Sequence, residues 1–107
     1  MARPESPAEV RRWFLAQVRD LWPVAAGSLS LRKSPCTRAG CPACASGEQH
    51  ASYVLYGRRR GRRVARYVPD DIAAQLERAV ANGRALRELI VEAGERYLRA
   101  LKAQRQR

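Results

Sequence analysis

Three cysteines and the single histidine of this chain fall within fifteen consecutive positions, in the spacing Cys-x4-Cys-x2-Cys-x5-His. Glycine and proline residues between them favour tight turns. Thiolate sulfur and neutral imidazole are preferred ligands of a tetrahedral zinc ion, and this spacing lets one short loop fold around one ion. We therefore predict one structural zinc in a knuckle-like loop, held by Cys36, Cys41, Cys44 and His50.

Other interpretations of this cysteine cluster remain open. A disulfide would leave one cysteine unpaired, and unliganded thiols usually lie in apolar surroundings, which these lack. A redox pair of Cys41 and Cys44 would need a strand, loop and helix pattern that is not evident around them. A catalytic zinc needs a general base, and Glu48 is the only carboxylate in the loop. Because the sequence also shows no paired carboxylates, nucleophile with a base, or phosphate loop, we predict that the protein is not an enzyme.

The second chemical feature is a concentration of positive charge. The 21 Lys and Arg exceed the 10 Asp and Glu by 11, and five arginines fall within residues 58–63. Between Ser28 and Pro69, nine basic residues stand against the single acid Glu48. Such a surface favours a polyanionic partner, and guanidinium suits phosphate and base edges. We predict binding to nucleic acid, DNA or RNA, through the following residues: Arg32, Lys33, Arg38, Arg58, Arg59, Arg60, Arg62, Arg63 and Arg66.

Tyr53, Tyr56 and Tyr67 lie beside these arginines in the sequence. If they face outward, their rings are able to stack on unpaired bases. If they face inward, they are the half-buried tyrosines that strands commonly contain. The sequence leaves both possibilities open.

The spacing of apolar residues predicts the helices and strands that position these side chains. Ser6-Pro7-Ala8-Glu9 has the residues of a capping box with proline at the first helical position, and the apolar residues after it recur every three or four positions. We expect a helix over 6–22, ending near Pro23. A short alternating segment around Leu29 predicts a strand, and two β-rich runs on either side of the basic loop predict a hairpin. Together they give a three-stranded antiparallel sheet, with the zinc loop joining its first two strands.

A helical segment fills the C-terminal third. Pro69-Asp70-Asp71 ends the last strand and begins a helix, and Asn82-Gly83 is typical of a helix C-cap or a kink. The segment therefore forms either a helical hairpin or one long helix. A long helix would leave an apolar stripe from Leu86 to Leu101 for another molecule. This supports an alternative function, in which the protein is an interaction module that pairs with a second copy or a protein partner.

These elements predict an α+β fold in one domain over 1–107. Its parts are an N-terminal helix over 6–22, a zinc loop with a basic β-hairpin over 28–68, and C-terminal helices over 70–105. No apolar run is long enough to span a membrane, and the N-terminus has no apolar signal core. We therefore expect a cytoplasmic protein, a location where cysteine clusters are more often metal sites than disulfides.

Residues 27–100 resemble a family of small uncharacterised bacterial proteins, a domain of unknown function. The resemblance rests on the Gly27 to Arg32 segment, the cysteine cluster followed by His50, the Tyr67-Val68-Pro69 junction and the long charged helix. The family has one residue between the last two cysteines where this chain has two. It also tends to have His-Gly-Pro-Tyr where this chain has His50-Ala51-Ser52-Tyr53. Members often lie near transposase genes, so the resemblance implies a role with nucleic acid in mobile elements and carries no established activity.

Overall fold

The computed structural model describes residues 3–34 and 50–106, apart from the side chains of residues 33, 34, 50 and 51. It has an N-terminal helix, a three-stranded antiparallel sheet and a long C-terminal helix, which confirms the predicted α+β fold. The elements in chain order are α1 (Pro7–Val18), β1 (Ser28–Ser34), β2 (His50–Arg59), β3 (Arg62–Val68), the 3-10 helix η1 (Asp70–Ile72) and α3 (Ala73–Arg105).

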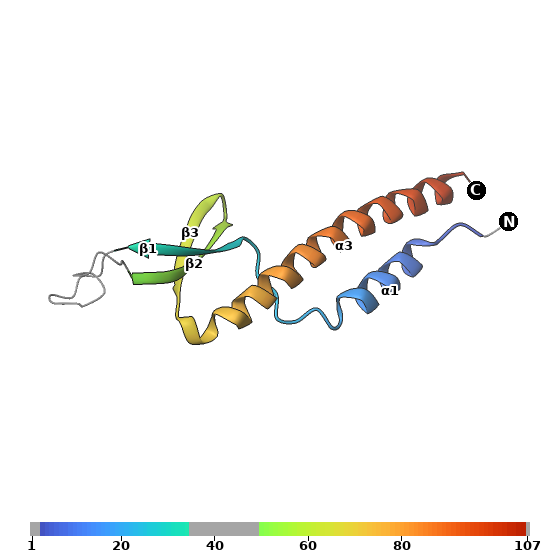
Figure 1. Cartoon of the computed structure of the whole chain (residues 1–107). Helices are drawn as coiled ribbons and strands as arrows, with labels where there is room; N and C mark the ends of the chain where they lie inside the picture. The colour runs from blue at the N-terminus through green and yellow to red at the C-terminus, as the bar shows by residue number, and fades with distance from the viewer. Residues whose placement is uncertain (1–2, 35–49, 107) are drawn as a thin grey trace, which may run out of the picture.

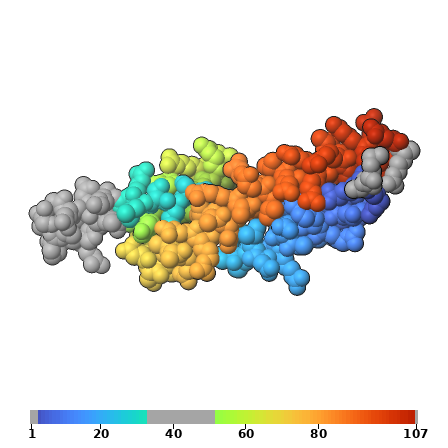
Figure 2. Space-filling view, turned by 45° about the vertical axis from the view of Figure 1, so that its right-hand side comes forward, coloured from blue at the N-terminus to red at the C-terminus, as the bar shows by residue number. Residues whose placement is uncertain are grey.

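The molecule is elongated, with principal extents of 75 × 27 × 18 Å. α1 and α3 lie side by side and run in opposite directions, and the sheet lies at the other end, over the start of α3 (Figure 1). The space-filling view shows the same division of the body into a sheet end and a helical end (Figure 2). We call these two parts the sheet half and the helical half.

The capping box at the start of α1 is formed as predicted. The backbone amide of Glu9 donates to Ser6 Oγ at 3.1 Å, and the amide of Ser6 donates to Glu9 Oε1 at 3.4 Å. The helix ends at Val18, however, and the predicted end at Trp22 is wrong. The residue before a proline is disfavoured in helical geometry, and here that residue is Trp22, so the chain leaves the helix before reaching Pro23.

The sheet has the order β1-β2-β3, and both strand pairs are antiparallel. Ser34 pairs with His50, so residues 35–49 join the first two strands, as the sequence predicted. β2 and β3 are joined by the two residues Arg60 and Gly61, whose φ angles are +53° and +78°. Two successive positive φ angles are the mark of a type I′ hairpin turn, which matches the twist of the flanking strands.

α3 is one continuous helix of 33 residues, so the C-terminal segment is the long helix and not the hairpin. The helix does not end at Asn82-Gly83, which was one of the two possibilities that the sequence left open. Instead, the segment that links α1 to β1 crosses α3 there. Asn82 Nδ2 donates to the carbonyl of Pro23 at 2.8 Å, and a Cβ on Gly83 would lie 1.9 Å from the carbonyl oxygen of Ala25. Asn82 and Gly83 therefore contact the linking segment in the middle of α3, whereas local sequence rules associate this pair of residues with a helix terminus.

The core is thin and extends along α3. Its buried residues include Val68, Ala73 and Val80 where the sheet meets the helix, and Val10 and Ala100 where α1 meets it. Small buried side chains allow close packing of a slender molecule, and they bury little apolar area per residue. Within residues 3–34 and 50–106, no helix combines the length and apolarity that a bilayer span requires.

Candidate nucleic-acid interface

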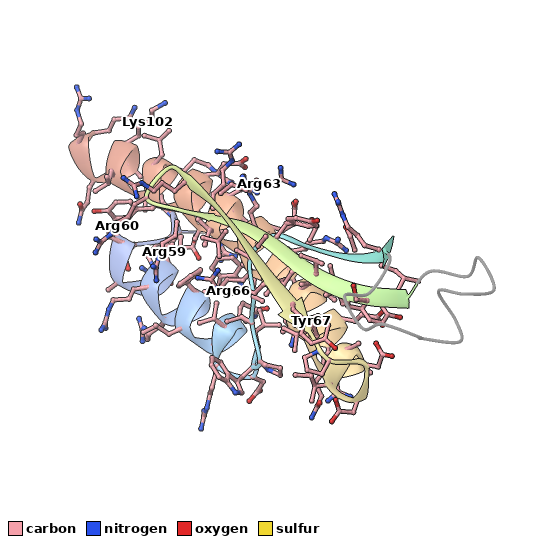
Figure 3. The ribbon with its side chains drawn as sticks, turned by 90° about the vertical axis from the view of Figure 1, so that its left-hand side faces the viewer. Arg59, Arg60, Arg63, Arg66, Tyr67 and Lys102 are labelled. Atoms are coloured by element: carbon pink, nitrogen blue, oxygen red, sulfur yellow. The ribbon has the colours of Figure 1, made fainter. Side chains whose placement is uncertain are left out.

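The strand register divides the hairpin arginines between the two faces of the sheet. Successive side chains of a strand point to opposite faces, and directly paired residues share a face. The cross-strand pair Arg58 and Arg63 therefore lies on one face, and the pair Arg59 and Arg62 lies on the other, together with Arg66. Figure 3 shows this division, with Arg63 on one side of the hairpin ribbon and Arg59 and Arg66 on the other.

The inner face is the one that meets the rest of the protein. It carries Leu29, Leu55 and Val68, and Val68 is buried. A Cβ on Gly57 would lie 3.5 Å from the carbonyl oxygen of Ala26, which places the linking segment over this face. α3 contacts β1 as well. Beyond this cover, the inner face opens into a hollow of about 260 Å³, lined in part by Arg59, Arg66 and Val64.

The opposite side, which we call the outer face, carries both aromatic and basic side chains. Its members are Arg32, Tyr56, Arg58, Arg63 and Tyr67. Tyr67 is 67% exposed. The guanidinium carbons of Arg63 and Arg32 lie 4.7 Å and 5.3 Å from the ring centroid of Tyr56, within range of a cation–π interaction. The sequence left the orientation of the tyrosines open, and the structure places Tyr56 and Tyr67 on the outer face and Tyr53 on the inner one.

The hairpin arginines have no carboxylate partner among the described residues. The three ion pairs that this part of the chain forms are Arg3–Glu9, Arg96–Glu5 and Arg96–Glu92, all in the helical half. In the hairpin, Arg58 Nη1 donates to the carbonyl of Gly61 at 3.4 Å, and Arg66 Nη1 donates to the carbonyl of Ala65 at 3.2 Å. The described residues of 28–69 contain eight Lys and Arg and no Asp or Glu. Within residues 28–34 and 50–69, therefore, no carboxylate neutralises the positive charge.

The predicted zinc ligands Cys36, Cys41 and Cys44 lie outside the described residues, and of His50 only the backbone is described. Arg38 also lies outside them, and the side chain of Lys33 is not described. In the described part of the chain, no group of three or more His, Cys, Asp or Glu side chains is placed to hold a metal ion. The structure does show that the two strand ends on either side of the cysteine segment are paired, Ser34 with His50.

Sequence reasoning missed the residues that hold α1 against α3. The Arg96 side chain is 24% exposed and donates to Glu5 through Nε at 3.0 Å and through Nη2. Its guanidinium carbon lies 3.9 Å from the ring centroid of Trp13. Hydrogen bonding to Arg96 lowers the pKa of Glu5, and hydrogen bonds from Arg3 and Ser6 lower the pKa of Glu9. The one local signal for this cluster is the spacing of Glu92 and Arg96, which are four residues apart on one helix and so lie close enough to pair.

No protein-family model matches the chain, and no curated protein and no solved structure matches it either.

Proposed function

We propose that this protein is a non-catalytic nucleic-acid-binding protein that contacts its partner through the arginine-rich β2–β3 hairpin. One observation carries the proposal: the described residues of 28–69 contain eight Lys and Arg and no Asp or Glu, so the hairpin arginines, on both faces and at the turn, have no carboxylate partner among the described residues. A side chain that stabilises the fold through charge would have such a partner. Guanidinium groups without one are free to bind phosphate oxygens, often in a bidentate manner.

The test is a binding titration of the full chain against duplex DNA, single-stranded DNA and structured RNA at several salt concentrations. If about five phosphates are neutralised, the log-log salt slope on duplex DNA is about −4 to −5. A variant with Arg58, Arg59, Arg60, Arg62 and Arg63 changed to Gln should lose most of the affinity and most of this slope.

The matched control removes the same number of charges from the helical half, with Arg78, Arg84, Arg87, Arg99 and Arg105 changed to Gln. All five are exposed on α3 and form none of the described ion pairs. This control should keep most of the affinity. An equal loss in both variants would show attraction by net charge alone, and failure of the wild type to bind any of the three at low salt would refute the proposal.

We propose further that the segment between β1 and β2 holds one structural zinc ion through Cys36, Cys41, Cys44 and His50. The donor set supports this, since three thiolates and one imidazole form a closed tetrahedral site, and the pairing of Ser34 with His50 joins the two ends of the segment. The purified protein should contain about one zinc per chain. Cys36→Ser and Cys44→Ser should each lower the zinc content and the melting temperature, and an unchanged melting temperature in both would contradict a structural role.

A second candidate function is self-association through α3. Ile90, Tyr97 and Leu101 are 54%, 50% and 36% exposed, and with Gly94 they follow the alternating spacing of three and four residues that forms a coiled-coil seam. Beside them, an apolar hollow of about 510 Å³ lies between α1 and α3. The described helical segments 3–27 and 70–106 carry eleven Lys and Arg against nine Asp and Glu, so two such surfaces repel each other only weakly.

We therefore favour a second copy of this chain as the occupant of this stripe. Sedimentation equilibrium over a range of protein concentrations should show a dimer that Ile90→Asp dissociates and that the hairpin variant retains. A monomer at all concentrations would exclude self-association.

A further inference from the structure

The outer face of the sheet combines one exposed aromatic ring, that of Tyr67, and one half-buried ring, that of Tyr56, with cations, and no described acidic residue lies on the sheet. Tyr67 on β3 pairs with Val54 on the neighbouring strand β2, and Tyr56 is two residues further along β2. The two tyrosines are therefore diagonal neighbours about 7–8 Å apart at Cα. Arg58 and Arg63 lie at the turn end of this face, and Arg32 lies on β1 at the other side of Tyr56. The face thus has one ring on the central strand and one on the edge strand β3, with a cation on each of the three strands.

The chemistry of this arrangement differs from that of a simple basic ribbon. Phosphates of duplex and single-stranded nucleic acid are both bound by arginine, whereas a ring such as that of Tyr67 gains by stacking only on a base whose face is uncovered. In a duplex the base faces are covered by neighbouring base pairs. A sheet that presents aromatic rings between cations therefore favours the unpaired strand, in DNA or RNA, because every base has a face for stacking.

The two tyrosines are not equivalent. Tyr67 is largely exposed, and its ring is not among the described cation–π pairs. Tyr56 is half-buried and lies under the guanidinium groups of Arg32 and Arg63. These two arginines are held over an aromatic surface with no carboxylate partner in the part of the chain that the structure describes, and they remain able to donate to phosphate oxygens.

We propose, building on the proposed nucleic-acid binding, that the outer face binds single-stranded nucleic acid, with Tyr67 stacking on one base and Arg32, Arg58 and Arg63 binding the adjacent phosphates. Tyr56 holds Arg32 and Arg63 in place beside that base. The inner-face arginines Arg59 and Arg62 contribute to the general positive field and do not contact the bound strand.

The experiment measures fluorescence anisotropy of the full chain with a labelled twelve-nucleotide thymidine strand, its uridine counterpart and a twelve-base-pair duplex, all at one salt concentration. The single strands should bind at least tenfold tighter than the duplex. Tyr67→Thr keeps a strand-forming residue and removes the ring, so it should weaken single-strand binding about tenfold and leave duplex binding within about twofold. Tyr67→Phe keeps the ring and should bind like the wild type.

Two variants with equal loss of charge test which face of the sheet binds the single strand. Arg58→Gln with Arg63→Gln removes one cross-strand pair from the outer face, and Arg59→Gln with Arg62→Gln removes the next pair from the inner face. Each double variant loses two charges. The outer-face double variant should lose at least five times more single-strand affinity than the inner-face one.

The outcomes separate this inference from the proposed function. If the protein binds nucleic acid but prefers duplex, or if Tyr67→Thr and the outer-face double variant behave like their controls, the single-strand inference is refuted and nucleic-acid binding stands. If neither the single strands nor the duplex bind at low salt, the single-strand inference and the proposed nucleic-acid binding are both refuted.

Discussion

The two halves of this molecule differ in the balance of their charges, and in the best-packed arginine that each contains. In the helical half, Arg96 donates to two carboxylates and stacks on Trp13, so its charge and its planar group are both engaged within the protein. In the sheet half, the arginines on β2 and β3 have no carboxylate partner among the described residues, and two of them lie on the face of Tyr56. Among the described residues, acids nearly equal Lys and Arg in number in the helical half, and no acid accompanies the eight Lys and Arg of the sheet half.

This contrast shows which charges the fold needs. An arginine that holds two helices together is partly buried, and its neighbours include acids from both sides of the contact. An arginine that is exposed, repelled by its neighbours and without an acid partner adds no ion-pair stability, and like charges directly opposite each other destabilise a sheet. Arg58 opposite Arg63 and Arg59 opposite Arg62 are two such pairs. Retaining them costs stability, which supports a role outside the fold.

The largest effect is expected at the contact that joins the two halves. In Gly83→Ala the new Cβ would overlap the carbonyl oxygen of Ala25, and the linking segment would have to leave α3. Overpacking together with lost hydrogen bonds should lower the free energy of unfolding by more than about 3 kcal/mol. Gly94→Ala is the control, because no atom lies within 4 Å of its new Cβ, and it should raise stability by about 1 kcal/mol. Thermal melts of both variants measure this, and equal melting temperatures would contradict the described crossing.

The next effect concerns the helical half alone. Trp13→Ala removes the ring under Arg96 and part of the contact between α1 and α3. Since Trp13 is only half-buried, the loss should be about 2 kcal/mol, below the roughly 3–5 kcal/mol of a fully buried tryptophan. Urea unfolding gives the stability, and the nucleic-acid titration should give an unchanged affinity at a temperature where the variant is folded. A fall in affinity for folded protein would show that the two halves are coupled.

Acid should weaken the helical half through its carboxylates. The pKa of Glu5 and that of Glu9 are lowered from their ordinary value of 4.5 in the folded protein. Between pH 4.5 and the lower pKa values of the folded protein, the unfolded chain therefore binds more protons than the folded one. The stability that these two groups contribute is present above pH 4.5, and it is lost as the pH falls through their folded pKa values. Melting temperature measured between pH 6 and pH 2.5 should fall below about pH 4.5. Glu5→Gln should reduce the size of that fall, and an unaltered pH profile in this variant would contradict the role of Glu5.

The smallest effect is expected at Arg60, where one substitution should change stability and nucleic-acid binding in opposite directions. Arg60 is in the left-handed region, which asparagine adopts more readily than arginine. Arg60→Asn should therefore raise stability slightly, by about 0.5 kcal/mol, and lower the salt slope of nucleic-acid binding by about 1. Calorimetry and the salt titration report the two results separately. An unchanged slope would remove Arg60 from the interface.

The sequence predicted much of this fold because its signals are local. Ser6 and Glu9 form the capping box that their spacing indicated, and the β-rich runs on either side of the basic loop form the hairpin. At Asn82-Gly83 the sequence left a helical hairpin and one long helix open, and this too has a physical reason. Glycine is favoured both after a helix end and where a backbone must come close to a helix, and only the tertiary structure distinguishes these uses.

The candidate interface was predictable as a set of arginines but not as two faces. The alternation of side chains along β2 and β3 fixes the faces once the turn is known to be Arg60-Gly61 and the strand pairing follows from it. The contact of Arg96 with Glu5 and Trp13 could not be predicted from local sequence patterns, because Glu5 and Arg96 are 91 positions apart in the sequence. The zinc site stays a prediction.

The crossing at Gly83 makes the whole sheet part of one closed loop of the chain. Pro23 and Asn82 are 59 positions apart, and their hydrogen bond closes a loop that contains the whole sheet. The entropy of closing such a loop changes slowly with its length, by about 0.6 kcal/mol for each doubling. Lengthening or shortening the segment between β1 and β2 should therefore cost the crossing at Gly83 little stability.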